Sequence, residues 1–507
     1  MPARQAAHRP PLLRRSGGTR CSFEFVFGPR LGRNSGRSHR TFAAHLGIRR
    51  YATRPFRGAL VSRVAGPAGR TTLALPGRDL RPPEYPGSRG EALAPPRPVR
   101  DIRAAQMPTL FLIVFVDLVG FGLVIPLLPF YALRFGASPQ QVTVLLAIYS
   151  LMQLFTAPLW GRLSDRAGRR PVLMVSMAAS VFAYLWIGSA TALWMLFAAR
   201  ALAGACAGNI AAAQAYIADV TKPEERARGM GLIGAAFGLG FIIGPALGGL
   251  LAGNDPATAD VETPAWVAAG LSFLALCGVI LLLPESLPAD QRGIRGPSRN
   301  RFAAILDVLR RPVLSRLILI FFLVILAFAG MESTFALWAI GEFSWGPRQV
   351  GYVFSYVGVL SAILQGGLIG RLTRLFGEER LLVSGLALIG AGLLVMPFAR
   401  SLGVLAVAVT SLALGMGLMQ PSLNSLISRR AGREEQGEVL GVSQSVGSLS
   451  RVLGPAVAGL LFGEFGRNAA FFWGSVLVAA ALLVALKLIR RLGATRLATP
   501  KPAKPAG

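Results

Sequence analysis

The chain has 507 residues, of which 53% are hydrophobic and only 15% are charged. Soluble domains carry about a quarter charged residues, so the composition excludes an ordinary soluble globular protein. The formal net charge of +29 is unevenly spread, because residues 1–106 hold 21 arginines and five acidic residues and so contribute +16. All three histidines, His8, His39 and His45, also lie there, which removes imidazole from the possible proton carriers of the remaining chain.

Residues 1–106 are rich in Arg, Pro, Gly, Ala and Ser and show no helical or strand period. They lack the apolar content for a core, so we predict a disordered extension. Three interpretations stay open: a basic tail for nucleic acid or acidic lipid, an organellar transit peptide, or upstream sequence translated in error before a true start at Met107. We favour the third, since Met107 directly precedes the first apolar span, and we expect no nucleic-acid partner and no need for the extension.

From residue 107 onward, apolar runs long enough to cross a bilayer recur, which predicts an all-α membrane protein. We expect a six-helix half over 107–284, a cytoplasmic linker over 285–314, a second six-helix half over 315–490 and a cytoplasmic tail over 491–507. The twelve predicted spans are 108–131, 142–161, 171–190, 193–217, 229–252, 265–284, 315–340, 350–371, 380–399, 402–427, 437–462 and 468–489.

The two halves are copies of one design. The polar loop Gly161–Pro171, GRLSDRAGRRP, recurs in reduced form as Gly370–Gly377, an offset of 209 positions, and Gly244-Pro245 recurs as Gly454-Pro455, an offset of 210. A unit of about 200 residues used twice in tandem is typical of secondary transporters, which bind substrate between the repeats. A small-molecule substrate in an alternating-access cycle is therefore expected.

Arginine and lysine gather in the loops on one side of the predicted bundle. The loop Gly161–Pro171 holds four arginines, and the linker and the loop after the tenth span are also basic, whereas the opposite loops hold only Arg134, Arg348, Arg400 and Arg467. Because basic short loops stay in the cytoplasm, both termini are predicted to be cytoplasmic. We expect a multi-pass protein of the inner (plasma) membrane, with the lipid bilayer as its surroundings.

The loop Gly161–Arg170 resembles the loop 2–3 signature of the major facilitator superfamily, G-x-L-x-D-R-x-G-R-R. Six residues also match in spacing the glycine motif of its proton-coupled antiporters: Gly231, Gly240, Gly244, Pro245, Gly248 and Gly249. The first span, with Asp117 followed by paired glycines and prolines, is similar to the drug-efflux branch that includes tetracycline exporters. The resemblance covers 107–490 and implies proton-driven export of amphipathic small molecules or drugs. We expect a monomer.

The resemblance also implies a conformational latch in this loop, formed by Gly161, Asp165, Arg166, Gly168, Arg169, Arg170 and Asp219. Asp165 is implied to lie near the start of span 11, around Gly437–Gly441, where a helix N-terminus favours a carboxylate. Arg169 would pair with Asp219 and help to hold the outward-facing state. The alternative is a loop whose arginines only set topology. The second copy has Arg374 in place of Asp165, so we expect it to lack the latch.

Gly240, Gly244 and Gly248 recur every four residues and form a bare ridge on the fifth span. We expect this ridge to pack on Ala362, Gly366 and Gly370 of the eighth span. The resemblance implies that this contact seals the outer vestibule, and simple helix packing is the alternative. Pro245 should bend the span because it lacks a backbone donor.

Few ionisable residues lie deep in the spans. Asp117, Arg200 and Glu332 are the candidates for proton coupling, with Arg451 a fourth buried charge. Such groups are costly in hydrocarbon unless they face a cavity or a partner. Asp117 and Arg200 are expected to pair, and movement of the arginine would then switch the proton affinity of the carboxylate. Structural ion pairing alone is the other interpretation.

Neutral polar side chains complete the predicted substrate cavity. They are Gln153, Asn209, Gln214, Gln365, Gln420 and Asn424, together with Glu332, which could attract a cationic substrate. The chain has no nucleotide-binding loop and no Cys/His cluster, so we expect neither an enzyme nor a cofactor or metal. A metabolite or sugar transporter of the same superfamily is the first alternative, and a membrane scaffold or receptor that transports nothing is the second.

Overall fold

The computed structural model describes residues 99–222, 225–293, 301–431 and 435–498. These ranges are helical and contain no strand. Within them, twelve helical stretches are long and apolar enough to cross a membrane, as predicted. Most of the predicted N-terminal extension, residues 1–98, lies outside the described residues. Its last residues, by contrast, begin the first helix at Val99, eight residues before the predicted start at 107.

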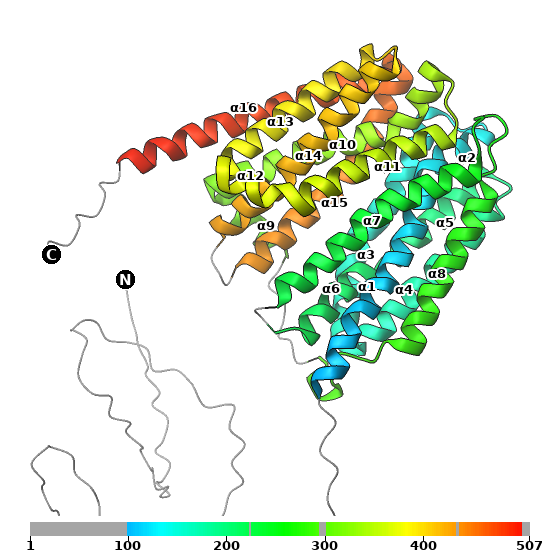
Figure 1. The fold of residues 1–507 in the computed structure, drawn as a ribbon, viewed down its shortest axis with the longest axis vertical. Coiled ribbons are helices and arrows are strands. Elements are labelled where there is room, and N and C mark those ends of the chain that lie inside the picture. The colour runs from blue at the N-terminus through cyan, green and yellow to red at the C-terminus, as the bar shows by residue number, and fades with distance from the viewer. Residues whose placement is uncertain (1–98, 223–224, 294–300, 432–434, 499–507) are drawn as a thin grey trace, which may run out of the picture. The chain divides into compact units, whose positions relative to one another are not determined.

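The first half forms six spans from eight α-helices (Figure 1). The first span bends at a 3₁₀ turn, where Pro126 cannot supply a backbone donor. The fourth is broken into α5 and α6. The elements are α1 (Val99–Val124), η1 (Ile125–Leu127), α2 (Leu128–Arg134), α3 (Pro139–Ala167), α4 (Arg169–Gly188), α5 (Leu193–Ala205), α6 (Asn209–Val220), α7 (Arg226–Ala252) and α8 (Glu262–Leu282).

The second half repeats this plan, preceded by a short 3₁₀ turn, η2 (Ala289–Gln291), and a helix, α9 (Arg301–Arg310), inside the predicted linker. Its eighth span contains a π-helical turn. The elements are α10 (Pro312–Phe343), α11 (Pro347–Ile363), η3 (Leu364–Leu368), α12 (Ile369–Phe376), α13 (Glu378–Val395), η4 (Met396–Phe398), α14 (Leu402–Arg430), α15 (Gln436–Phe465) and α16 (Ala469–Ala498). The last helix extends into the predicted tail, of which residues 499–507 lie outside the described residues.

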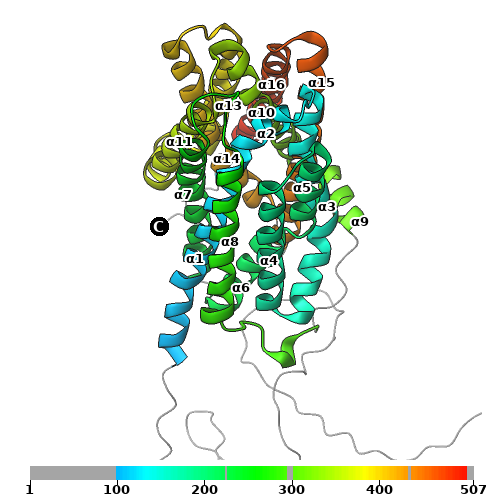
Figure 2. The same ribbon diagram turned by 90° about the vertical axis from the view of Figure 1, so that its right-hand side faces the viewer.

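The packing follows the repeat. In the first half α1 packs on α7 and α8, and in the second half α10 packs on α15 and α16. Figure 2 shows α1, α8 and α4 of the first half side by side. The main contacts between the halves are α7 with α11 and α3 with α15. In each contact the fifth span of one half packs on the second span of the other half. The two bundles are therefore related by a pseudo-twofold arrangement.

The halves touch closely at one end of these four helices. We call the end that carries the arginine-rich loop Gly161–Pro171 the basic end, and the opposite end the far end. At the far end, a methyl group on Gly351 would overlap the Pro245 carbonyl, and one on Gly459 would overlap Thr143. Arg348 of α11 donates its backbone N–H to the Gly253 carbonyl at 3.0 Å. Backbone approaches backbone here, so the far end is closed.

The basic end of the same helices differs. Nine glycines there have, beyond the adjacent backbone of their own helix, no heavy atom within 4 Å of the position that a Cβ would take: Gly161 on α3, Gly231, Gly234 and Gly238 on α7, Gly366, Gly367 and Gly370 around η3 and α12, and Gly437 and Gly441 on α15. Small residues in a membrane bundle usually mark close helix contacts. Their open surroundings indicate that the halves are separated at the basic end in this conformation.

Candidate functional site

Asp117 on α1 is a buried carboxylate, with 5% of its surface exposed. It accepts hydrogen bonds from Asn209 Nδ2 at 2.5 Å and from Ser272 Oγ at 3.3 Å. Both donors are neutral. The predicted contact with Arg200 is wrong for this conformation, since no ion pair joins the two side chains and Arg200 lies against an aromatic ring instead.

Asn209 reaches Asp117 because the fourth span is broken just before it. The Ser176 hydroxyl on α4 fills the break: it accepts from the N–H groups of Gly208 at 3.2 Å and Asn209 at 3.1 Å, and it donates to the Cys206 carbonyl at 2.6 Å. Backbone groups in a bilayer must be satisfied within the protein, and one hydroxyl does so here. We predicted a continuous helix over 193–217 and missed the break, because the sequence of that segment does not indicate that a serine of another span bonds to its backbone.

Arg200 on α5 is 3% exposed and its guanidinium carbon lies 4.6 Å from the centre of the Tyr149 ring on α3. Its Nε atom is buried and has no hydrogen-bond partner. A cation over a ring face is attracted by the negative face of the π-system. Tyr149 was not among the predicted site residues, because a single tyrosine in an apolar span carries no sequence signal of its own.

The second half has its own charged residues within the spans. Glu332 on α10 is partly buried, and Arg451 on α15 lies close enough to interact with it electrostatically. Among the described residues, no ion pair of 4.0 Å or less joins the Glu332 carboxylate to the Arg451 guanidinium. Arg451 donates to Ser448 Oγ at 3.2 Å. The site thus contains a carboxylate and an arginine in each half, and in neither half do the two form an ion pair.

The predicted cavity amides differ in their surroundings. Only Asn209 bonds to a charged site residue. Gln153 on α3 and Gln420 on α14 are partly buried, whereas the repeat-equivalent Gln214 and Asn424 are exposed. Gln365 is exposed and lies in the π-helical turn η3, a kind of turn that recurs at functional sites. Their grouping into one substrate cavity remains a prediction.

The arginine-rich loop is built around Arg169, whose side chain is 2% exposed. Its Nε donates to Asp219 at 2.9 Å, as the resemblance implied, and its Nη1 donates to Asp165 at 2.7 Å and to Ser164 at 3.1 Å. Gly161 nearby faces open space, as do Gly437 and Gly441 at the start of α15. The implied approach of the loop to span 11 therefore stays a prediction for the opposite state.

Glu285, just after α8, contacts this loop, and we did not predict it. Its carboxylate accepts from the backbone N–H of Arg169 at 2.8 Å and of Arg170 at 3.2 Å. It therefore caps the N-terminus of α4, where unsatisfied donors and the helix dipole favour an anion. The only sequence signal was an acidic residue beside the end of the sixth span. That residue lies more than one hundred positions from the helix that it caps, so the sequence does not connect the two.

The second copy has an ion pair at the positions equivalent to Arg169 and Asp219, although Arg374 replaces Asp165, so the absence of a latch there stays a prediction. Glu378 stands 209 positions after Arg169, and Arg429 stands 210 positions after Asp219. These two residues form an ion pair at 2.9 Å. The contact persists with the signs reversed, which a comparison of single positions such as Arg374 with Asp165 could not reveal.

The glycine ridge packs differently from our prediction. Methyl groups on Gly240, Gly244 and Gly248 would meet Leu118, Gly122 and Leu123 of α1, within the same half. The contact with the eighth span is made by the neighbouring face of α7, through Pro245 and Gly249. The predicted partners Gly366 and Gly370 face open space, and so does Gly231 of the motif. The ridge therefore fixes α7 to α1 and presents an adjacent face to α11.

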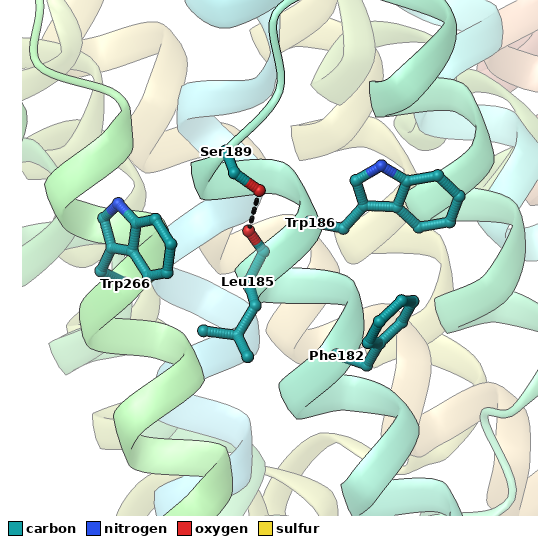
Figure 3. Close-up of a pocket in the computed structure, with 5 residues that line it drawn as sticks. All are labelled: Phe182, Leu185, Trp186, Ser189 and Trp266. Atoms are coloured by element: carbon teal, nitrogen blue, oxygen red, sulfur yellow. Dashed lines mark hydrogen bonds between the residues drawn. The ribbon is translucent and has the colours of Figure 1, made fainter.

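A shallow hollow of about 380 Å³ lies between α4 and α8, away from these charges. Figure 3 shows its lining of Phe182, Leu185, Trp186, Ser189 and Trp266. The Ser189 hydroxyl is already bonded to the Leu185 carbonyl at 2.8 Å. None of the predicted cavity residues lines the hollow, and its indoles are near span ends, where aromatic residues gather at a membrane surface.

Two six-span bundles with buried charges, meeting at one end, have the architecture of a secondary transporter. The sequence matches the model of the Major Facilitator Superfamily over residues 110–455 and again over 342–507, so the chain belongs to this superfamily. Its members are transporters of small molecules and not enzymes. The chain is accordingly a multi-pass membrane protein.

The relatives confirm the similarity to the drug-efflux branch. The chain is 33% identical to the tetracycline resistance protein, class C, of Escherichia coli over 75% of this chain and 94% of the relative. It is 29% identical to multidrug resistance protein 2 of Bacillus subtilis over 70% and 90%, respectively. The crystal structure of the human organic anion transporter MFSD10 covers 76% of this chain and 99% of that chain, with a TM-score of 0.59 and 26% identity.

Proposed function

We propose that this chain is a proton-driven antiporter that exports amphipathic small molecules, with tetracycline-like drugs as the leading substrate class. Its sequence similarity to tetracycline and multidrug resistance proteins supports this substrate class. The observation that carries the proton coupling is Asp117, a buried carboxylate held by two neutral donors. A carboxylate without a bound cation in a membrane bundle is suited to take up and release a proton.

The basic end is proposed to face the cytoplasm of a cell whose inner membrane holds the protein, because short basic loops are retained there. The conformation, closed at the far end and separated at the basic end, is then the inward-facing state. Substrate would enter from the cytoplasm, and rocking of the halves about the site would release it outside. The open surroundings of Gly437 and Gly441 support this assignment.

Asp117→Asn provides the test. The variant keeps the size and polarity of the side chain and cannot exchange a proton, so it should lose uphill, proton-driven efflux and keep downhill exchange. Transport of tetracycline would be measured in proteoliposomes with and without an imposed proton gradient, at matched amounts of folded protein. The matched comparison is Glu332→Gln in the second half, which should instead change substrate preference, with cationic substrates affected first.

If the Asp117→Asn variant still concentrates substrate with normal pH dependence, the proton carrier is elsewhere and Glu332 becomes the leading candidate. If wild-type protein moves no drug under any gradient, the proposed function is wrong. A susceptibility panel in an efflux-deficient host would then show whether another substrate class is exported.

A second candidate function is transport of an organic anion. The chain resembles the human organic anion transporter MFSD10 in fold and sequence. The supporting observation is Arg451, a partly buried cation near the interface between the halves. Its guanidinium donates a hydrogen bond to Ser448, which is neutral. An anionic substrate could bind there. Arg451→Gln should then abolish uptake of an anionic probe and spare that of a cationic one.

A further inference from the structure

Arg200 has an unusual position for a buried cation. Its guanidinium carbon stands 4.6 Å from the Tyr149 ring centre, and its Nε has no hydrogen-bond partner. Buried charges are ordinarily paired and fully hydrogen-bonded, because removal from water is costly. The ring of Tyr149 therefore holds an arginine that has a stronger potential partner elsewhere in the same half, Asp117.

We propose that Tyr149 is a positioning residue that keeps Arg200 away from Asp117 in this conformation, and that withdrawal of its ring during the transport cycle lets Arg200 displace the proton from Asp117. In that step the O–H bond of the Asp117 carboxylic acid breaks and the proton passes to water. The carboxylate that remains pairs with the guanidinium, which stays protonated throughout. The inference rests on the proposed proton coupling and names the side chain that controls it.

Gly204 explains how the ring is positioned. Gly204 and Arg200 are one turn apart on the same face of α5. A methyl group on Gly204 would overlap the backbone of Tyr149, including its carbonyl. The backbones of α3 and α5 therefore lie directly against each other at this point, and the Tyr149 ring extends from there over Arg200. A glycine in this position is needed for that approach.

The charged and titratable groups around Asp117 come from several helices. Tyr149 of α3 and Tyr184 of α4 each interact electrostatically with both Asp117 and Arg200. α6 and α8 contribute the neutral donors Asn209 and Ser272. The membrane-spanning part of α7, residues 229–252, holds no titratable residue. The two tyrosines are thus shared neighbours of the acid and the arginine, and Tyr149 is the one whose ring covers the guanidinium.

Movement of α3 would connect this arrangement with the transport cycle. At its far end α3 packs closely on α15 of the other half, through Thr143 and Gly459. Tyr149 is nearly two turns further along α3, where its ring packs on Phe121 at 5.4 Å between centroids. Arg451 of α15 also acts electrostatically on the Tyr149 hydroxyl. A rocking of α15 against α3 therefore changes the surroundings of the ring.

The test is a titration of Asp117 itself. The carbonyl stretch of its protonated form would be followed by infrared spectroscopy on the full chain in lipid, and identified by its loss in Asp117→Asn. In Tyr149→Leu, Arg200 is free to approach, and an opposite charge favours the carboxylate, so the titration midpoint should fall by about one pH unit or more, a tenfold loss of proton affinity. Tyr149→Phe keeps the ring face and should titrate like the wild type.

Three further variants make the result specific. Gly204→Ala should lower the midpoint in the same direction, since it displaces the ring without removing it. Tyr149→Leu combined with Arg200→Gln should restore the midpoint, because the cation responsible is absent. Phe241→Leu removes a ring that packs on Phe121 but not on Tyr149, and it should leave the midpoint unchanged.

An unchanged midpoint in Tyr149→Leu would overturn the inference, as would a shift that persists without Arg200 or one that Tyr149→Phe reproduces. The readout needs no substrate, so it separates the two proposals. Midpoints that shift as expected in a protein that shows no proton-driven transport would refute the proposed function and leave the positioning role of Tyr149 standing.

Discussion

The two halves make the same contact at the basic end with opposite charges. The first half pairs Arg169 with Asp219, and the second pairs Glu378 with Arg429, each at 2.9 Å. The surroundings differ even more than the signs, because the arginine side chain is 2% exposed in the first pair and 71% exposed in the second. The repeat has thus retained a contact between two helices without retaining its charge pattern or the burial of its arginine.

The difference in burial predicts that the first half depends more on its ion pair for stability than the second half does. Arg169 is shared by three side-chain acceptors, and Glu285 caps the backbone next to it. Removing one member of such a buried network leaves the others with unsatisfied charge. In the second half the Arg429 cation is solvated, whereas the Glu378 side chain is 9% exposed and also accepts a hydrogen bond from Ser425 Oγ at 2.6 Å. Loss of Arg429 therefore leaves a carboxylate that keeps one donor, and an ion pair with a solvated cation contributes less to stability than a buried network.

Arg169→Ala should have the largest effect on this comparison. Loss of the buried guanidinium leaves Asp219 and Asp165 without their shared donor, which should destabilise the fold by about 3–5 kcal/mol. The matched control is Arg429→Ala, for which we expect about 1–2 kcal/mol, because the 9% exposed Glu378 carboxylate loses its cation and keeps its hydrogen bond from Ser425. Thermal unfolding of both variants in detergent would measure the difference. Equal losses of stability would show that burial does not distinguish the two loops.

The glycines before the two pairs provide a smaller contrast. Gly168 has φ +110° and Gly377 has φ +79°, so alanine is strained at both positions. At Gly168 the added methyl group would also displace the Glu285 carboxylate from the start of α4, while at Gly377 it would meet nothing within 4 Å. We expect Gly168→Ala to cost about 2–3 kcal/mol and Gly377→Ala about 1 kcal/mol. A larger loss at Gly377, measured by the same unfolding assay, would contradict this order.

Hydropathy and repeat spacing were sufficient to predict the twelve spans, because each span carries its own apolar signal. The Arg169–Asp219 pair also followed from the resemblance. The remaining site features depend on contacts between distant segments. Ser176 of α4 satisfies the backbone groups at the break in the fourth span, and Glu285 caps a helix more than one hundred residues earlier. Local sequence patterns contain no information about such partners.

The two predicted contacts that this conformation does not make have a common physical origin. The pairing of Asp117 with Arg200 was inferred from opposite charge alone, and Tyr149 competes for the arginine in this conformation. The glycine ridge was assigned to the second half from its spacing, which identifies a face for close packing but not the helix that occupies it. Charge and periodicity predict that a contact exists, and only the three-dimensional arrangement chooses the partner.

Exchanging the charges within each pair should give the smallest effect in the second half and a clear one in the first. Glu378→Arg with Arg429→Glu recreates the signs of the first half at a pair with one solvated member, and the Ser425 hydroxyl beside position 378 can accept from an arginine, so stability should stay within about 1 kcal/mol of the wild type. Arg169→Glu with Asp219→Arg places a carboxylate beside Asp165, where like charges repel, and should lose several-fold more stability than the exchange in the second half. Both double variants would be compared with their single variants in thermal unfolding, which isolates the coupling within each pair.

If the first half tolerates its exchange as well as the second, the network around Arg169 does not depend on the sign of its central residue, and the asymmetry between the halves is one of burial alone.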